Sequence, residues 1–248
     1  MDERPTFNPE VEKSEAVVNI SSSGETETER LISNFAHTPF DLDGKHYQSV
    51  EGFWQGLKFP EGSKEREEAS QLFGVKAKKM GKRAGEVAEI EYQGGRIKTG
   101  SSEHHELMKR AIQAKLDQNP EVLELLLATG DAKITHVLKR ADGTPLPDSK
   151  TIPGETFAQI LMDLRKELGA YVDFGEIAHQ RLHEQTQYMS RYIHGRIKGY
   201  PNLGEGLRFR QRDPSDYHTY KIHKDDIEEF ARRVEEYEHS EKGPIIIS

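Results

Sequence analysis

The sequence predicts an α+β fold that is mainly helical, with a small β element in the core and a helical C-terminal extension. Apolar residues recur at helical spacing in several stretches, whereas strand-like runs are few and short. Hydrophobic residues make up 34% and charged residues 31% of the 248 residues, which favours a polar surface around a modest core. We divide the chain into a disordered lead-in (1–13), a core domain (14–170) and an extension (171–248) that packs on the core.

The first elements are short strands followed by a helix. Residues 15–23 are β-like until a Ser/Gly-rich end breaks the run. Residues 40–50 predict a hairpin, because Asp43-Gly44 is a strong turn pair between two β-like segments. A helix follows directly, and Ser49 is in position to cap its first turn.

The middle of the chain predicts two helices and a strand. Residues 104–116 have helical periodicity. In the next helix, Asn119 is placed as the N-cap, Pro120 as the first helical residue and Gly130 as the left-handed terminator. Residues 131–138 are expected to form a short strand.

The last third begins with a Pro/Gly-rich loop at 140–154, which is long enough to indicate a functional role. Residues 157–168 then carry a complete apolar stripe that predicts a core helix ending at Gly169. We expect residues 171–201 to form one long helix and residues 224–239 a final amphipathic helix.

Composition excludes several classes of protein. The absence of cysteine rules out disulfides, thiolate metal sites and a cysteine nucleophile. No stretch approaches the roughly 18 apolar residues of a membrane span, and the first residues lack the features of a secretory signal. We therefore expect a cytosolic protein with no membrane partner. The net charge of −8 argues against a protein that grips a long duplex, but basic clusters at 75–83 and 206–212 leave local contact with nucleic acid open beside plain solvated surfaces.

The helix after the hairpin has two different faces. At about 100° per residue, one face holds an acid, an indole, an amide and an amine within about 60° of one direction. These residues are Glu51, Trp54, Gln55 and Lys58, and the opposite face holds Val50, Phe53 and Leu57.

Two glycines, Gly52 and Gly56, lie between these faces. Each costs about 1 kcal/mol relative to alanine in a helix, so we expect another element to approach this flank closely. The residues alone leave open whether the polar face meets solvent or a ligand.

Residues 31–59 resemble the signature of the NADAR superfamily, whose best-known members are the YbiA-like proteins. The resemblance rests on a Ser-Asn-Phe box, an Asp-Gly hairpin and a Val-Glu-x-x-x-Gln-x-x-Lys-Phe helix. Here these are Ser33-Asn34-Phe35, Asp43-Gly44, and Val50-Glu51, Gln55 and Lys58-Phe59. The resemblance resumes at 107–131 and 157–168, and covers roughly residues 15–169.

This resemblance implies a YbiA-like core and N-glycosidase chemistry on nucleotide-derived ribosides. It implies catalytic roles for Glu51 and Lys58 and substrate-binding roles for Ser33, Asn34, Phe35 and Gln55. Trp54 is a further candidate, either to stack on a base or to close the pocket. Glu51 would stabilise the oxocarbenium-like transition state or deprotonate an attacking group. Lys58 has two open roles: an ammonium partner of the leaving group or a phosphate, or a nucleophile whose pKa is lowered by burial beside Lys76, Lys78 and Lys79.

Further binding residues are expected outside this helix. Residues 94–102 end at a helix start, where free N–H groups favour an anion, and they offer Arg96, Gly100, Ser101 and Ser102 for a diphosphate. The alternative is a plain loop with Ser102 as the helix cap. His136 is a candidate to orient a base or ribose, with a buried core histidine as the rival interpretation. His104 and His105 are adjacent on a helix and point about 100° apart, so we expect no metal site and no cofactor.

Two departures from the YbiA-like pattern bear on the substrate. An Asp-Trp pair usually precedes the Leu-Met helix, and this chain has GSSEHHELM there. The usual Glu-Asp element and Trp-Gly loop are also absent, so that Trp54 is the only tryptophan. This pattern resembles the branch that removes ADP-ribose from guanine as the antitoxin to a DNA ADP-ribosyltransferase toxin.

We therefore expect ADP-ribosylated guanine, in DNA or as a nucleotide, as the substrate and a cognate toxin as a partner. The competing hypotheses are a YbiA-like N-glycosidase acting on a ribosylamino-pyrimidine phosphate of riboflavin metabolism, and a non-catalytic ADP-ribose-binding module. The sequence leaves open whether the substrate is DNA, RNA or a free nucleotide.

Overall fold

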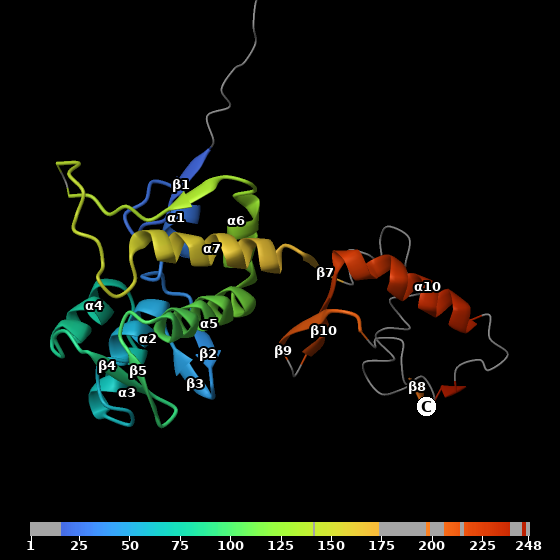
Figure 1. The fold of residues 1–248 in the computed structure, drawn as a ribbon, viewed down its shortest axis with the longest axis horizontal. Helices are drawn as coiled ribbons and strands as arrows, with labels where there is room; N and C mark the ends of the chain where they lie inside the picture. The colour runs from blue at the N-terminus through green and yellow to red at the C-terminus, as the bar shows by residue number, and fades with distance from the viewer. Residues whose placement is uncertain are drawn as a thin grey trace, which may run out of the picture.

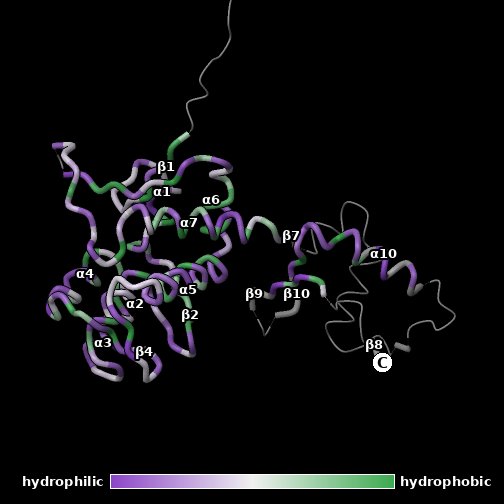
Figure 2. Tube along the Cα trace, viewed as in Figure 1, coloured by the Kyte–Doolittle hydropathy of each residue, from purple (hydrophilic) through white to green (hydrophobic). Residues whose placement is uncertain are grey.

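Two long helices, α5 (Ser102–Gln118) and α7 (Gly154–Leu168), pack against each other at the centre of the core (Figure 1). The computed structural model describes residues 16–140, 142–173, 197–198, 206–213, 216–238 and 245–246. Apolar and polar residues alternate along both helices (Figure 2), as expected for helices that bury one side. The buried side of α7 is formed by Phe157, Ala158, Ile160, Leu161, Leu164 and Leu168, which confirms the predicted core helix.

One end of α7 is covered by the N-terminal elements. Strand β1 (Val17–Asn19) pairs in parallel with β6 (Lys133–Thr135), and both predicted strands are therefore present but shorter than expected. Helix α1 (Glu27–Ile32) begins with a capping box between Thr26 and Glu29 and packs against α6 (Pro120–Ala128). Asn119 precedes α6 and Gly130 follows it with a φ of 53°, as predicted.

The predicted hairpin consists of β2 (Phe40–Leu42) and β3 (Lys45–Tyr47). Its turn residues Asp43 and Gly44 have positive φ values of 50° and 77°, the backbone that an Asp-Gly turn favours. Helix α2 (Val50–Gly56) follows, and the Ser49 hydroxyl accepts a hydrogen bond from the Gly52 amide at 2.9 Å. The predicted cap of this helix is confirmed.

Helix α2 is enclosed by two further helices. These are α3 (Lys64–Ser70) and α4 (Gly74–Lys82), and both contact α2. A Cβ added to Gly52 would lie 2.4 Å from the carbonyl oxygen of Leu72 and 2.8 Å from that of Ala69. The close approach predicted from the glycines of this helix is therefore made by the C-terminal end of α3 and the residues that follow it.

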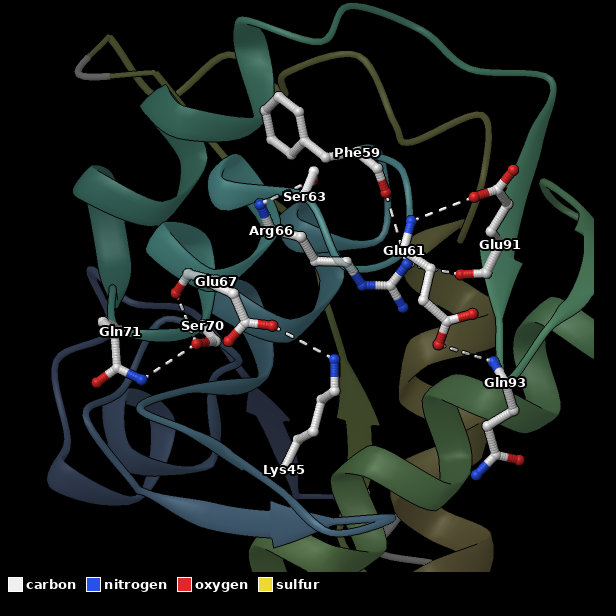
Figure 3. A network of polar contacts seen from close by, with 10 residues as sticks. All are labelled: Lys45, Phe59, Glu61, Ser63, Arg66, Glu67, Ser70, Gln71, Glu91 and Gln93. Carbon is white, nitrogen blue, oxygen red and sulfur yellow. Dashed lines mark hydrogen bonds and ion pairs between the residues drawn. The ribbon is translucent and has the colours of Figure 1, made fainter.

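A network of polar contacts around Arg66 joins α3 to the hairpin of β4 (Glu89–Tyr92) and β5 (Gly95–Lys98) (Figure 3). The buried guanidinium of Arg66 donates to the carbonyl oxygen of Glu91 at 2.7 Å and lies 5.9 Å from the ring of Tyr92. The carboxylate of Glu61 accepts from the backbone amides of the hairpin turn at 3.1 and 2.9 Å. This network fixes the outer wall against which α2 packs.

The C-terminal region corrects part of the predicted helical extension. Among its described residues, Tyr171–Asp173 form strand β7, where a helix over 171–201 was predicted; residues 174–196 and 199–201 lie outside the described residues. Strand β7 pairs with β10 (Asp216–His223), which pairs with β9 (Phe209–Asp213). The pairing partners are far along the chain, so local periodicity did not reveal them.

The other predictions for this region are confirmed or concern residues outside those that the structure describes. A 3-10 turn (Lys224–Asp226) leads into helix α10 (Ile227–Glu238), which matches the predicted final helix. Strands β8 (Ile197–Lys198) and β11 (Ile245–Ile246) form a second small pair. Arg210 of β9 makes an ion pair with Asp117 of α5, so this sheet contacts the core. The predicted lead-in at 1–13 lies outside the described residues, and the proposed division at residue 170 remains a prediction.

Within the described part of the chain, no helix is both long enough and apolar enough to cross a membrane.

Candidate active site

The polar face of α2 lines a pocket of about 530 Å³. The pocket gathers eight residues that the sequence singled out: Ser33, Asn34, Phe35, Glu51, Trp54, Gln55, Lys58 and His136. The opposite face of α2 packs in the core through Val50, Phe53 and Leu57, each at most 2% exposed. The structure therefore confirms that α2 has one apolar face in the core and one polar face at the pocket.

Glu51 lines this pocket and is only 7% exposed. Its Oε1 accepts a hydrogen bond from Gln55 Nε2 at 2.8 Å, one helical turn further along α2. Its backbone amide donates to the carbonyl oxygen of Asn34 at 2.9 Å, which ties the Ser-Asn-Phe box to the start of the helix. Burial raises the pKa of Glu51, against the hydrogen bond from Gln55 and the charges of Lys78 and Lys58.

Lys58 stands in the turn after α2 and is half-buried. Burial lowers the pKa of Lys58, against the attraction of Glu51 and Glu86, and the like charge of Lys78 lowers it further. Of the three lysines expected to act on Lys58, only Lys78 lines the pocket; Lys76 and Lys79 do not. The pocket thus holds an acid that binds its proton more tightly than usual and an amine that releases its proton more readily.

Lys78 was not among the predicted substrate-binding residues. Its Nζ lies 5.4 Å from the ring centroid of Phe35, a cation–π contact between α4 and the Ser-Asn-Phe box. Its charge acts on both Glu51 and Lys58. The basic run at 75–83 predicted that positive charge would lie near nucleic acid or solvent. Only the packing of α4 against α2 places Lys78, and not its neighbours, at the pocket.

Lys115, which the sequence did not indicate as a site residue, holds the backbone at the start of the Ser-Asn-Phe box. Lys115 is 1% exposed, and its Nζ donates to the carbonyl oxygens of Leu31, Ile32 and Ser33 at 2.7, 3.1 and 2.9 Å. It thereby satisfies the last carbonyls of α1. Burial lowers the pKa of Lys115 to about 7. A signal was present, because Lys115 continues the core spacing of Met108, Ala111 and Ile112.

Two buried side-chain oxygens near the pocket have no hydrogen-bond donor among the described residues: Asn34 Oδ1 and Gln55 Oε1. Gln55 Oε1 faces the backbone of Gly81 in α4, where an added Cβ would lie only 1.7 Å away. Gly81 therefore makes room for the Gln55 side chain that holds Glu51. Asn34, whose Oδ1 is the other of these oxygens, lines the pocket.

Trp54 stacks on His104 of α5, with ring centroids 4.2 Å apart and planes 20° apart. His104 Nδ1 accepts a hydrogen bond from the Gly100 amide at 2.9 Å, so the imidazole is fixed on both its face and its edge. Burial lowers the pKa of His104 to about 4, with a smaller contribution from His105. The imidazole beside Trp54 is therefore neutral at ordinary pH.

The predicted anion site before α5 is not brought into the pocket. None of Arg96, Gly100, Ser101 and Ser102 lines it. The Gly100 amide is used by His104, and the cap of α5 is Ser101, which accepts from the His104 amide, rather than Ser102. Arg96 lies on β5, where its guanidinium is within 3.9 Å of the carboxylates of Glu89 and Glu91.

His136 lines the pocket opposite α2. Its Nδ1 lies 2.6 Å from the carbonyl oxygen of Ile20, and its ring meets Phe157 edge-on at 4.9 Å. The ring packs at the edge of the core and also borders the pocket, and its role in orienting a base or ribose stays a prediction.

The loop between β6 and α7 forms the outer wall of the pocket through Lys139, Leu146, Pro147, Ser149, Thr151 and Ile152. The carboxylate of Asp148 accepts from the Gly154 amide at 2.9 and 3.0 Å, at the start of α7. His105 Nε2 lies 2.9 Å from the carbonyl oxygen of Thr151. The loop that its length marked as functional therefore borders the site. In the part of the chain that the structure describes, no cluster of His, Asp and Glu forms a metal site.

Comparisons with known proteins agree with this picture. A family model described as bacteriophage protein GP30.3 matches residues 28–166. The N-glycosidase YbiA of Escherichia coli (strain K12) is 32% identical over 106 residues, which cover 42% of this chain and 61% of that protein. The N-glycosidase YbiA of Shigella boydii serotype 4 (strain Sb227) has the same identity and coverage. The chain thus spans less than two thirds of the length of these relatives.

A solved structure also matches. It is the NMR structure of the E. coli protein YbiA, with 27% sequence identity, a TM-score of 0.45, and coverage of 62% of this chain and 86% of that one.

Proposed function

This chain belongs to the family described as bacteriophage protein GP30.3, and we propose that it is an N-glycosidase that hydrolyses the bond between ADP-ribose and guanine in nucleic acid. The observation that carries the proposal is the pairing of Glu51 and Lys58 in one pocket with opposite pKa shifts. Its similarity to proteins named N-glycosidase YbiA supports the reaction class.

Cleavage of a C–N glycosidic bond places positive charge on the ribose ring in the transition state. A buried carboxylate in a pocket stabilises that charge strongly, because little water screens it there. Glu51 is suited to this role, since Gln55 fixes one of its oxygens and leaves the other for the substrate or water. Its raised pKa also makes it a better base than an ordinary carboxylate for an attacking water or hydroxyl.

Lys58 acts in one of two ways. As a neutral amine, it attacks C1 of the ribose while the bond to guanine breaks, and the proton that the attacking nitrogen loses passes to guanine. The ring then opens to an imine, and water adds to release the sugar and restore the amine. As an ammonium, it instead donates to the leaving group or a phosphate. The lowered pKa of Lys58 favours the first role.

The charge of the pocket supports an anionic substrate. Its lining includes Lys78 and Lys139, which are cations whichever role Lys58 takes, beside the carboxylate of Glu51. A diphosphate is a natural partner for such cations, and Trp54 offers an aromatic ring to a base. An activity of this kind reverses DNA ADP-ribosylation and would make the protein the antitoxin of an ADP-ribosyltransferase toxin.

A second substrate is favoured by the relatives named N-glycosidase YbiA. In that case the pocket takes a ribosylamino-pyrimidine phosphate of riboflavin metabolism. This smaller substrate needs one phosphate site, whereas Lys78 and Lys139 offer two cations.

One assay separates these activities from a binding-only module. The protein is incubated with an oligonucleotide carrying ADP-ribosylated guanine and, separately, with the ribosylamino-pyrimidine phosphate, and the products are followed by mass spectrometry. We expect free ADP-ribose and an unmodified oligonucleotide from the first. If sugar phosphate is released from the second substrate and no ADP-ribose from the first, the protein catalyses the riboflavin-type reaction instead. If the protein binds ADP-ribose tightly but cleaves neither substrate, it is a binding module.

A further inference from the structure

Helix α4 concentrates positive charge on its outer side in a protein whose net charge is −8. Between Gly74 and Lys82 it has no acidic residue, and it buries Ala77, Met80 and Gly81. Lys76, Lys79 and Lys82 are exposed, and no carboxylate among the described residues lies within ion-pairing distance of them. These three lysines are therefore open to an anionic partner.

An aromatic pair lies at the start of the same helix. The Phe73 side chain is exposed (43%) and stacks on the ring of His37, with centroids 4.6 Å apart and planes 28° apart. The His37 ring is held by Gln48 at 2.6 Å, and Gln48 in turn contacts His46 at 3.3 Å. Because its rings are already fixed, this pair can stack on a planar group with little loss of side-chain entropy.

This surface is continuous with the pocket. An added Cβ on Gly74 would lie 3.6 Å from the carbonyl oxygen of Phe35, and Lys78 of the next turn lies over the Phe35 ring. Phe35 and Lys78 both line the pocket. The aromatic pair and the exposed lysines thus begin where the pocket opens.

We propose that this α4 surface, formed by His37, Phe73, Lys76, Lys79 and Lys82, binds the single-stranded nucleic acid that carries the modified guanine. The proposal rests on the proposed function and extends it from a nucleotide to a polymer. Cations beside an aromatic platform are the combination that holds single strands without reading their sequence. From Lys76 to Lys82 the helix rises about 9 Å, which corresponds to about two to three nucleotides at about 3.4 Å each.

The proposal is tested with a fluorescently labelled, unmodified single-stranded DNA 15-mer, whose binding is followed by anisotropy over a series of KCl concentrations. The triple variant Lys76→Glu/Lys79→Glu/Lys82→Glu is expected to raise Kd at least about 30-fold. Its plot of log K against log salt should be shallower by about 2, because three phosphate contacts at about 0.7 each are lost. Phe73→Leu keeps an apolar side chain without a ring and should raise Kd about tenfold.

The matched control is Lys64→Glu/Lys133→Glu/Lys166→Glu, which makes the same change in charge at exposed positions on other elements. Equal weakening by both triples would mean that only net charge matters and would overturn the proposal, as would unchanged binding in the α4 triple. Loss of binding to anionic phospholipid vesicles, with DNA binding intact, would assign the surface to a membrane instead.

Turnover separates this proposal from the proposed function. The α4 triple should hydrolyse an ADP-ribosylated guanine mononucleotide at the rate of the unaltered protein and lose activity on the modified oligonucleotide. If the unaltered protein releases no ADP-ribose from either, the proposed function fails while the binding result stands. If both substrates are cleaved equally by the triple, the α4 surface is wrong and the proposed function stands.

Discussion

The imidazole of His104 lies face to face with the indole of Trp54, with ring centroids 4.2 Å apart. Trp54 is the only tryptophan of the chain and lines the pocket, so its emission reports on this site alone. His104 belongs to the helix start at which this chain departs from the Asp-Trp pattern of YbiA-like sequences. The stack links that departure directly to the polar face of α2 that lines the pocket.

The stack predicts an unusual response of fluorescence to pH. Because burial lowers the pKa of His104 to about 4, the imidazole should stay neutral from pH 8 to about 5 and become charged only below that. A charged imidazolium in contact with indole quenches its emission more strongly than a neutral ring. We expect constant Trp54 emission down to about pH 5, a change near pH 4, and loss of that change in His104→Phe. Far-UV circular dichroism excludes acid unfolding as its cause. A transition near pH 6.5 that disappears in His104→Phe would contradict this environment for His104.

Gly81 and Gly56 form a matched pair for testing how Glu51 is held. A Cβ at Gly81 would lie 1.7 Å from Gln55 Oε1, whereas one at Gly56 would meet the Ala69 Cβ at 3.4 Å. Gly81→Ala should displace Gln55 from Glu51 and lower kcat/KM at least about tenfold. Gly56→Ala should keep activity and gain up to about 1 kcal/mol in helix stability. Thermal unfolding and turnover of both variants check this, and an active Gly81→Ala enzyme would show that the Gln55 contact is dispensable.

Glu51→Gln should change stability in a manner that depends on pH. Because burial raises the pKa of Glu51 above its ordinary 4.5, the folded protein holds this proton more tightly than the unfolded chain does. The stability contributed by the protonated carboxyl is present below pH 4.5 and is lost as the pH rises through the folded-state pKa. Relative to the unaltered protein, Glu51→Gln should therefore be progressively more stable as the pH rises from 4.5 to 8. Urea unfolding at several pH values measures the difference in the free energy of unfolding between the two proteins. A difference that does not vary with pH would be evidence against a raised pKa of Glu51.

The two roles of Lys58 are separable by trapping. If its amine attacks C1, borohydride added during turnover should reduce the imine and leave the protein heavier by the ADP-ribosyl adduct at Lys58. Lys58→Arg keeps a positive charge but is a far poorer nucleophile, so it should be inactive under this mechanism. Peptide mapping locates the adduct. No adduct, together with an active Lys58→Arg enzyme, would leave Lys58 as an electrostatic partner only.

Local signals explain why much of the core could be predicted. The Asp43-Gly44 turn, the Ser49 cap and the stripe from Phe157 to Leu168 each depend on residues close together in sequence, and each is present in the structure. The glycines of α2 also predicted that another element approaches closely, but they did not identify it as the backbone carbonyls of Leu72 and Ala69.

The features that the sequence did not reveal depend on distant residues. Strand β7 is defined by its pairing with β10, about 50 residues later in the chain. Residues 94–102 had the composition of an anion site, but the side chains of His104 and Ser101 occupy the amides that an anion would need. In the site, the polar face of α2 could be read from spacing alone, whereas Lys78 and Lys115 reach it from separate helices.

Arg208 and Arg210 illustrate the same limit. The basic stretch 206–212 was a candidate for local contact with nucleic acid, and among its described residues Arg208 pairs with Asp226 and Arg210 with Asp117. Neither lines the pocket. The sequence shows that these arginines are present, but it does not show that carboxylates from distant positions pair with them.

The central claim is that the buried carboxylate of Glu51 drives cleavage of the glycosidic bond. The most direct measurement is the single-turnover rate at which ADP-ribose is released from ADP-ribosylated guanine by the unaltered protein and by Glu51→Gln, with folding of both verified by circular dichroism. We predict release by the former and a loss of more than about a hundredfold in the latter, equivalent to about 2.7 kcal/mol or more in the barrier. A Glu51→Gln variant that releases ADP-ribose at a near-normal rate would contradict the account.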